Sequence, residues 1–169
     1  YRTPAYAVRN GHGQLIGNLK FDHYQILAGN ESFNGTLPTA RTPHGQTLII
    51  TMHDETQTLA VRLKYTIVGD LPVLLKQVEY RNLTDTTLTI THAASLQLDF
   101  DDHAYDLITL TGAHLNEAKV TRQPLTPGKK SIGSNYGASG PQGVPATILA
   151  APATNEFAGE ALGVTLLWS

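Results

Sequence analysis

The sequence predicts an all-β fold, a two-sheet antiparallel sandwich, on three observations. Apolar and polar residues alternate with a period of two in several segments, as strands buried on one face require. Turn-forming pairs such as Asn10-Gly11, Asn34-Gly35 and Pro127-Gly128 separate these segments at short intervals. No stretch of about twelve residues shows helical periodicity. Short strands joined by polar turns are typical of a β-sandwich or a β-barrel.

The clearest predicted strand covers residues 59–67, where the odd positions are apolar and the even positions include Arg62, Lys64 and Thr66. Residues 88–98 place leucine and isoleucine side chains on one face, and His92 falls on that face as an expected core histidine. Further strands are predicted over 47–52, 73–80, 105–111 and 162–168, and residues 1–8 are expected to be extended.

Two connections are distinctive. Asn82-Leu83-Thr84-Asp85 predicts a tight hairpin between two antiparallel strands. Residues 126–145 are rich in Gly, Pro and Ser, and so long a loop is usually functional, interfacial or mobile. This loop lacks the Lys-Ser/Thr pair of a nucleotide-binding P-loop. Asn155 to Gly159 predicts one short turn, and no repeat or linker divides residues 1–169.

The composition excludes several classes of protein. Hydrophobic residues make up 41% and charged residues 15%, which is far from a disordered composition, and the net charge of -2 favours neither nucleic acid nor a membrane as a partner. The absence of cysteine excludes disulfides, thiolate zinc sites and cysteine nucleophiles, and it suits the bacterial cytoplasm. Because Tyr1 opens the chain and both ends fall within predicted strands, we expect a fragment truncated at both ends.

Candidate metal sites have weak support. Seven histidines occur without a His-x-His pair or a helical i, i+4 pair, so ordinary surface or strand positions are favoured and no cofactor is predicted. They are His12, His23, His44, His53, His92, His103 and His114. The acidic cluster of residues 99–103 with Asp106 lacks the glycine and the late glutamate of a calcium loop, which favours a solvated turn. Asp54, Glu55, Glu117 and Glu156 lie in turns or short polar stretches, so no catalytic residue is predicted.

A series of short segments nevertheless resembles one enzyme family. The segments are Tyr1-Arg2-Thr3-Pro4-Ala5-Tyr6, residues 47–51 followed by Asp54-Glu55, Asp70-Leu71-Pro72-Val73, Tyr80-Arg81-Asn82, residues 105–112 and Ser131-Ile132-Gly133-Ser134. In this order and spacing the chain resembles the N-terminal domain of glycoside hydrolase family 36 α-galactosidases of the lactic-acid-bacterial type. Residues 112–119 and 136–141 depart from the family's usual Trp and Arg-Glu-Arg and its Arg-Gly-x-Ser-Ser-His.

The resemblance implies a galactose-mutarotase-like β-supersandwich that precedes a catalytic (β/α)8 barrel and a small C-terminal β domain. Two barrel aspartates would hydrolyse terminal α-D-galactosyl residues, as in melibiose and raffinose-type oligosaccharides, with retention. The barrel and the C-terminal domain are absent from residues 1–169, so the resemblance assigns no catalytic residue here.

The resemblance also implies partners. Family members are often homotetramers in which the N-terminal domain reaches a neighbouring subunit's active site, and Arg2 matches the arginine implicated there. The alternative for Arg2 is an ordinary ion pair at a strand edge. Two other functions stay open: a carbohydrate-binding module, for which the 7% aromatic content offers few stacking rings, and a generic adhesion sandwich.

Overall fold

The computed structural model describes residues 4–29, 42, 44–100, 104–133, 140 and 143–167. Over these ranges the chain forms β-strands joined by turns, and all strand pairs are antiparallel, which confirms the predicted all-β class. No helix within these ranges is long and apolar enough to cross a membrane. The chain divides into two compact units, the first built mainly from residues before Phe100 and the second mainly from Phe100 onward.

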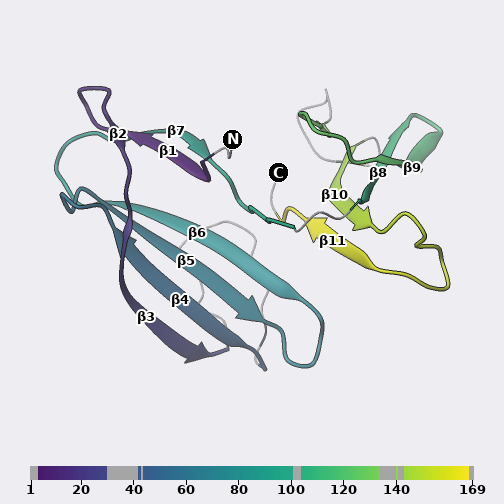
Figure 1. Cartoon of the computed structure of the whole chain (residues 1–169), viewed down its shortest axis with the longest axis horizontal. Coiled ribbons are helices and arrows are strands. Elements are labelled where there is room, and N and C mark those ends of the chain that lie inside the picture. Colours follow the sequence, from purple (N-terminus) through teal and green to yellow (C-terminus); the bar gives the residue numbers. More distant parts are fainter. Residues whose placement is uncertain are drawn as a thin grey trace. The chain divides into compact units, whose positions relative to one another are not determined.

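The first unit contains two sheets (Figure 1). One sheet has the order β3-β4-β5-β6, with strands β3 (Lys20–Ala28), β4 (Gln46–His53), β5 (Leu59–Ile67) and β6 (Leu74–Asn82). The other has the order β2-β1-β7, with strands β1 (Tyr6–Arg9), β2 (Leu15–Ile16) and β7 (Thr89–Ala93). We call the first of them the large sheet.

The register of the large sheet gathers apolar side chains on one face and mostly polar side chains, with Ile49 among them, on the other. Leu48 lies opposite Tyr65, and Ile50 lies opposite Leu63, so apolar side chains from β4 and β5 share a face. Thr47 lies opposite Thr66 on the other face. A slip of one residue would exchange the two faces, which is why the alternation in the sequence specifies the pairing so strongly.

The core of the first unit lies where β1 packs on the apolar face of the large sheet. Val8 of β1 clusters with Leu59 and Val61 of β5, and the exposed fractions of these three side chains are 0%, 1% and 3%. The rings of Tyr6 and Tyr80 lie 6.2 Å apart beside them. Two antiparallel sheets therefore stack face to face, as predicted for a β-sandwich.

The second unit contains one sheet with the order β11-β10-β8-β9. Its strands are β8 (Asp106–Ala113), β9 (Asn116–Pro124), β10 (Gly143–Ala150) and β11 (Ala161–Thr165). The hairpin of β8 and β9 turns at residues 114–115, and a longer loop over residues 151–160 joins β10 to β11. The buried residues of β8 and β10 are Leu107, Thr109, Gly143 and Ala150.

Several strand predictions differ from the structure. β5 matches the predicted range, but the strand expected over residues 88–98 ends at Ala93. The hairpin predicted at residues 82–85 is wrong, because β6 and β7 belong to different sheets. β2, β3, β9 and β10 lie outside the predicted strands, and β10 begins at Gly143, inside the predicted loop. Part of that loop, residues 134–139, 141 and 142, lies outside the described residues.

Candidate docking surface

The residues singled out from the sequence do not converge on one site. Arg2, the predicted substrate-binding residue, lies outside the residues that the structure describes, so its role stays a prediction. In the described ranges, no group of three His, Asp or Glu side chains could hold a metal ion. His92 is exposed on β7, an edge strand, so the prediction of a core histidine is wrong.

The candidate carboxylates form ion pairs and hydrogen bonds within turns and between strands. Glu55 forms a 2.8 Å ion pair with Lys20 at the surface, and a Glu117 side-chain oxygen accepts a hydrogen bond from the Leu115 backbone N–H at 3.1 Å. Asp106, predicted to lie in a solvated turn, is the first residue of β8 and pairs with Arg122 at 2.7 Å. Asp101, Asp102 and His103 lie outside the described residues.

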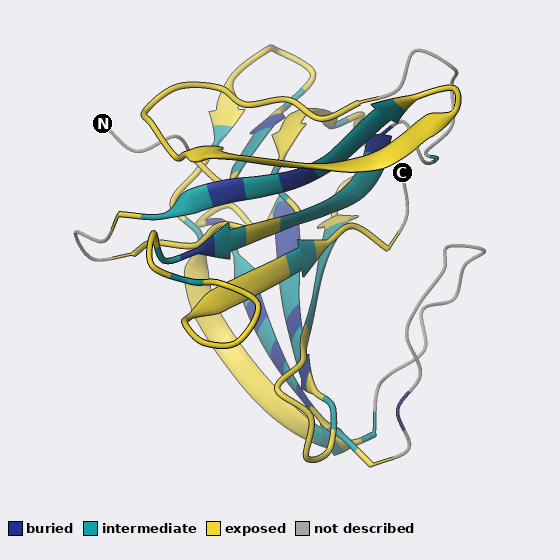
Figure 2. Ribbon diagram, turned by 90° about the vertical axis from the view of Figure 1, so that its right-hand side faces the viewer, coloured by how far each residue is buried: buried dark blue, intermediate teal, exposed yellow. Residues whose placement is uncertain are grey.

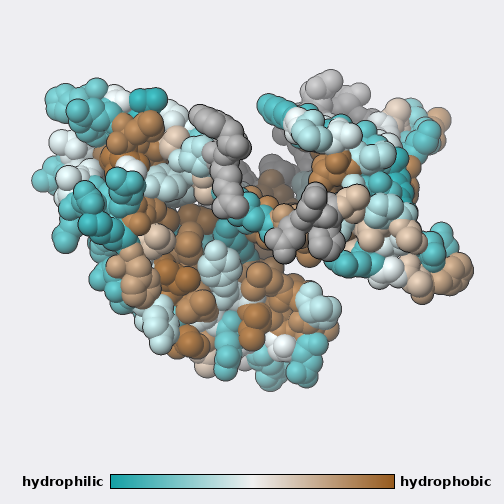
Figure 3. Space-filling model, in the orientation of Figure 1, coloured by the Kyte–Doolittle hydropathy of each residue, from teal (hydrophilic) through white to brown (hydrophobic). Residues whose placement is uncertain are grey.

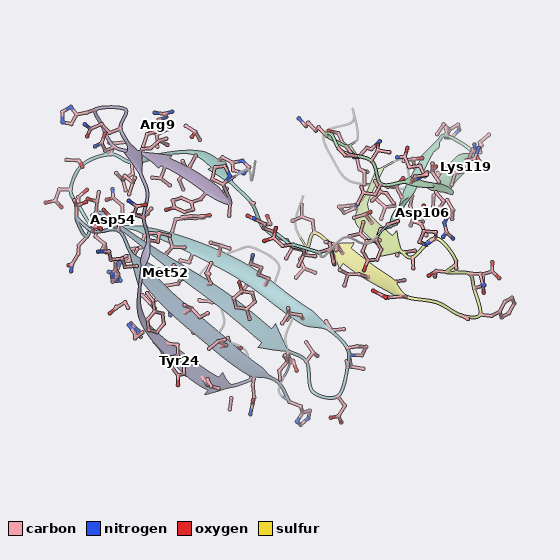
Figure 4. The ribbon with its side chains drawn as sticks, viewed as in Figure 1. Arg9, Tyr24, Met52, Asp54, Asp106 and Lys119 are labelled. Carbon is pink, nitrogen blue, oxygen red and sulfur yellow. The ribbon has the colours of Figure 1, made fainter. Side chains whose placement is uncertain are left out.

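Asp54 closes the turn between β4 and β5 (Figure 4). Its carboxylate accepts backbone hydrogen bonds from Thr58 and Leu59, both at 2.7 Å, and from Thr56 at 3.2 Å, and it also accepts the Thr56 hydroxyl. Burial alone would raise the pKa of Asp54, but these hydrogen bonds outweigh it and lower the pKa. The aspartate therefore acts as a structural anion and is not a proton donor near neutral pH.

The apolar face of the large sheet is only partly covered. The side chains of Phe21, Tyr24, Ile26, Ile67 and Leu74 share this face, as their pairing with Met52, Ile50, Leu48 and one another shows. Their exposed fractions run from 52% for Ile67 to 63% for Tyr24 and Ile26. We call these five residues the open apolar patch.

β1 covers only part of this apolar face. The cluster around Val8 covers the end of β5 that carries Leu59 and Val61, whereas Ile67 at the other end of β5 and nearly all of the edge strand β3 are exposed. In Figure 2, β3 is exposed along nearly its whole length, whereas β4 and β5 carry buried positions. Figure 3 shows hydrophobic side chains gathered over the large sheet. Contiguous apolar surface of this kind marks an interaction site.

The opposite face of the large sheet carries buried Ile49 among polar side chains that pair with one another. The hydroxyl oxygens of Thr47 and Thr66 lie 2.7 Å apart. The Glu79 carboxylate lies 3.1 Å from an Arg62 guanidinium nitrogen and 3.5 Å from Lys64 Nζ, and the Lys64 side chain is only 4% exposed. Because these polar groups have partners, the open apolar patch is the part of the sheet that calls for a further contact.

The second unit presents a different feature, the loop over residues 151–160. Arg122 of β9 donates hydrogen bonds to the backbone oxygens of Ala151, Pro152 and Thr154 at 3.1, 2.9 and 2.7 Å. Its Nε also donates to Asp106. The loop carries Phe157, which is 94% exposed. An aromatic residue within the polar run Asn155-Glu156-Phe157 was the only sequence signal of this feature.

Comparison with known proteins identifies the family. The model of the glycosyl hydrolase family 36 N-terminal domain matches residues 1–169. The chain belongs to glycosyl hydrolase family 36. The resemblance read from the short segments of this N-terminal domain is thereby confirmed.

The relatives of this family 36 domain are α-galactosidases. The chain is 37% identical over 172 residues to alpha-galactosidase Mel36A of Lactobacillus acidophilus and 34% identical to alpha-galactosidase 2 of Pediococcus pentosaceus. Both alignments include 100% of this chain, but they include only 23% and 24% of the lengths of the two relatives. The family 36 domain therefore spans about a quarter of their length.

Solved structures of α-galactosidases contain a region with the same fold as this chain. The family 36 α-galactosidase AgaB of Geobacillus stearothermophilus superposes with a TM-score of 0.88 at 32% identity, over 96% of this chain and 23% of that one. The α-galactosidase of Lactobacillus brevis superposes with a TM-score of 0.88 at 35% identity, over 96% of this chain and 22% of that one.

Proposed function

We propose that this family 36 domain is the non-catalytic N-terminal part of an α-galactosidase that hydrolyses terminal α-D-galactosyl residues, as in melibiose and raffinose-type oligosaccharides. Its part in the enzyme is that of a scaffold on which the catalytic barrel is held. Its relatives are named α-galactosidases, which supports the proposed activity. The domain spans about a quarter of their length, which supports the proposed role as a scaffold. In this proposal the enzyme works in the bacterial cytoplasm, which a chain without cysteine suits.

The observation that carries the scaffold role is the open apolar patch. Exposed fractions above half for Phe21, Tyr24, Ile26, Ile67 and Leu74 leave a hydrophobic surface that water disfavours. The occupant that we propose is the remainder of the same enzyme, because the relatives carry about three times this length of chain in addition. Burying the patch would attach the sandwich rigidly to the catalytic part.

A pair of neighbouring substitutions in the full-length enzyme tests this role. Ile26→Lys places a charge in the patch, whereas Gln25→Lys places the same charge on the opposite face of β3. We expect Ile26→Lys to destabilise the enzyme by about 2–4 kcal/mol, because the ammonium group would be buried without a partner. Gln25→Lys should change stability by less than about 0.5 kcal/mol. Thermal unfolding and hydrolysis of a nitrophenyl α-galactoside are the measurements.

Equal stability of the two variants would contradict the scaffold role. A fully stable enzyme that does not hydrolyse any α-galactoside would contradict the activity and leave the docking contact standing. The two parts of the proposal can therefore fail separately.

We further propose that the enzyme is a homo-oligomer, a tetramer, and that Arg2 contacts the galactoside in a neighbouring subunit. The support is the match of Tyr1-Arg2-Thr3-Pro4-Ala5-Tyr6 to the family's entry segment. Arg2→Ala should raise KM while sedimentation shows an unchanged assembly, and Arg2→Lys should restore part of the affinity if charge suffices. An unchanged KM would contradict this role.

A carbohydrate-binding module is the second candidate function, and the exposed rings of Phe21 and Tyr24 are the observation that favours it. Their exposed fractions are 60% and 63%, and aromatic faces can stack on the apolar side of a pyranose. Calorimetric titration of the intact enzyme, with its barrel site blocked by an inhibitor, would reveal a second galactose or melibiose site. Loss of that binding in Tyr24→Ala would assign it to the patch.

A further inference from the structure

Phe157 is the most exposed large hydrophobic side chain among the described residues. Its exposed fraction is 94%, and it lies in the loop of residues 151–160 between β10 and β11. Figure 1 shows this loop, in yellow, extending away from the strands that it joins. A single exposed apolar residue is ordinary on a protein surface. The structure of the surrounding loop is therefore the evidence on whether Phe157 contacts a partner.

The loop is held in one conformation by its own polar groups. The Asn155 side-chain oxygen accepts hydrogen bonds from the backbone N–H groups of Phe157 and Ala158 at 2.9 and 3.2 Å. The Thr154 hydroxyl donates to the backbone oxygen of Glu160 at 2.8 Å and accepts from the Glu160 N–H at 3.0 Å. These contacts fix the backbone on both sides of the phenyl ring before any partner binds.

The sheet below the loop fixes it further. Arg122 donates to the backbone oxygens of Ala151, Pro152 and Thr154, and Asp106 balances its charge. Gly159 has a φ of 129°, a conformation that favours glycine, and a Cβ there would clash with the Thr154 side chain. A loop that is ordered in advance loses less conformational entropy when it binds.

The polar groups of the loop point to a protein partner. Sugar sites combine a stacking ring with free donors and acceptors. Here Thr154 and the Asn155 oxygen are used within the loop, and the Glu160 carboxylate accepts the Tyr105 hydroxyl at 2.9 Å, which leaves Glu156 as the charged group next to the ring in sequence. A rigid loop that presents an isolated aromatic side chain matches the anchor residue of a protein interface.

We propose that residues 151–160 form a preformed docking loop that inserts Phe157 into an apolar pocket with a basic rim on the remainder of the same enzyme chain. The inference rests on the proposed function. Glu156 and Glu160 flank the ring and the loop contains no Lys or Arg, so the complementary rim is basic. The relatives hold about three quarters of their length outside the matched domain, which supplies the surface.

Oxidative footprinting of the intact, full-length enzyme tests the contact directly. Leu115 is the matched control, because it is 85% exposed at the turn of the β8–β9 hairpin in the same unit. Relative to the urea-unfolded enzyme, hydroxyl radicals should oxidise Phe157 several-fold more slowly, and Leu115 should show no protection. Equal oxidation of both residues in an active enzyme would overturn this inference and leave the proposed function intact.

Two controls identify the occupant. Protection of Phe157 that is lost when the oligomer dissociates into intact monomers would place the ring on a second copy and overturn the proposal. Protection that appears only when melibiose or raffinose is added would make the loop part of a sugar site, and it would also overturn the proposal. Protection that survives in the sugar-free monomer supports it.

Substitution gives an independent measurement. Phe157→Ala should shorten the half-life of thermal inactivation of the full-length enzyme about tenfold or more, as the loss of a buried phenyl contact implies. Phe157→Leu should retain most of the half-life because it keeps an apolar anchor, and Leu115→Ala should leave it unchanged. An unchanged half-life in Phe157→Ala would contradict the insertion.

Discussion

The turn between β4 and β5 and the loop between β10 and β11 are built alike and present opposite surfaces. In the first, the Asp54 carboxylate binds the backbone N–H groups of Thr58 and Leu59, and Leu59 is 1% exposed. In the second, Asn155 binds the N–H of Phe157, which is 94% exposed. Rigidity comes from polar groups in both turns. The first turn holds a buried side chain in the core, whereas the second loop holds an exposed side chain at the surface. The first therefore supports folding, and the second is suited to an interaction.

The largest expected effect is the loss of the Asp54 carboxylate. Asp54→Ala should destabilise the protein by about 3 kcal/mol, because it leaves several turn N–H groups, including that of buried Leu59, without an acceptor. Glu55→Ala is the control, since it removes only a surface ion pair with Lys20. Urea unfolding measures both variants, and similar losses would contradict the structural role of Asp54.

A smaller effect is expected from breaking the second loop at Gly159. Gly159→Ala should destabilise the second unit by about 2 kcal/mol, because the residue keeps a φ of 129° and a Cβ would strike Thr154. Gly163→Ala on β11 is the control, since a Cβ there meets nothing within 4 Å. Thermal unfolding that does not distinguish the two variants would mean that the loop is softer than its hydrogen bonds indicate.

Replacing Arg122 should loosen the loop without unfolding the sheet. Arg122→Lys keeps the charge beside Asp106 but loses the planar fork that reaches three backbone oxygens. We expect about 1 kcal/mol of local destabilisation, which is about fivefold faster amide hydrogen exchange over residues 151–160. Exchange in the β4–β5 turn is the internal control, and faster exchange in both turns would argue against a local role.

The smallest effect is a pH dependence of the first turn. The pKa of Asp54 in the folded protein lies below its usual value of 3.8, so its carboxylate stabilises the fold above that pH. This stabilisation is lost as the pH falls through the lowered pKa. Asp54→Asn should therefore differ most from the wild type near pH 7, by less than about 1 kcal/mol, and the difference should shrink in acid. A constant difference between pH 7 and pH 3 would contradict the lowered pKa.

Sequence reasoning succeeded where the structural signal is local. β5 matches its predicted range because apolar and polar residues alternate throughout it. β3 falls outside the predicted strands because a bulge between Phe21 and His23, near its start, shifts the alternation. The hairpin expected at residues 82–85 is wrong for another reason, because turn residues do not encode which sheet the next strand joins.

The features proposed to mediate interactions could not be predicted without the three-dimensional structure. Arg122 lies about 30 residues from the carbonyls that it binds, so no local pattern links them. Phe157 is part of a predicted short turn, but the hydrogen bonds that hold this turn through the side chains of Thr154 and Asn155 are visible only in the structure. Arg2, by contrast, was reached only through the family resemblance, and no contact described in the structure bears on it.

The sequence by itself determined the all-β class, the exclusion of cysteine chemistry and, through its ordered segments, membership of family 36. Period-two alternation and turn residues act between near neighbours, so they can be read directly from the chain. Only the tertiary structure decided that Leu59 and Val61 are covered while Tyr24 and Ile26 on the same face of the large sheet are open. Burial depends on what packs over a residue, and residues distant in sequence supply that cover.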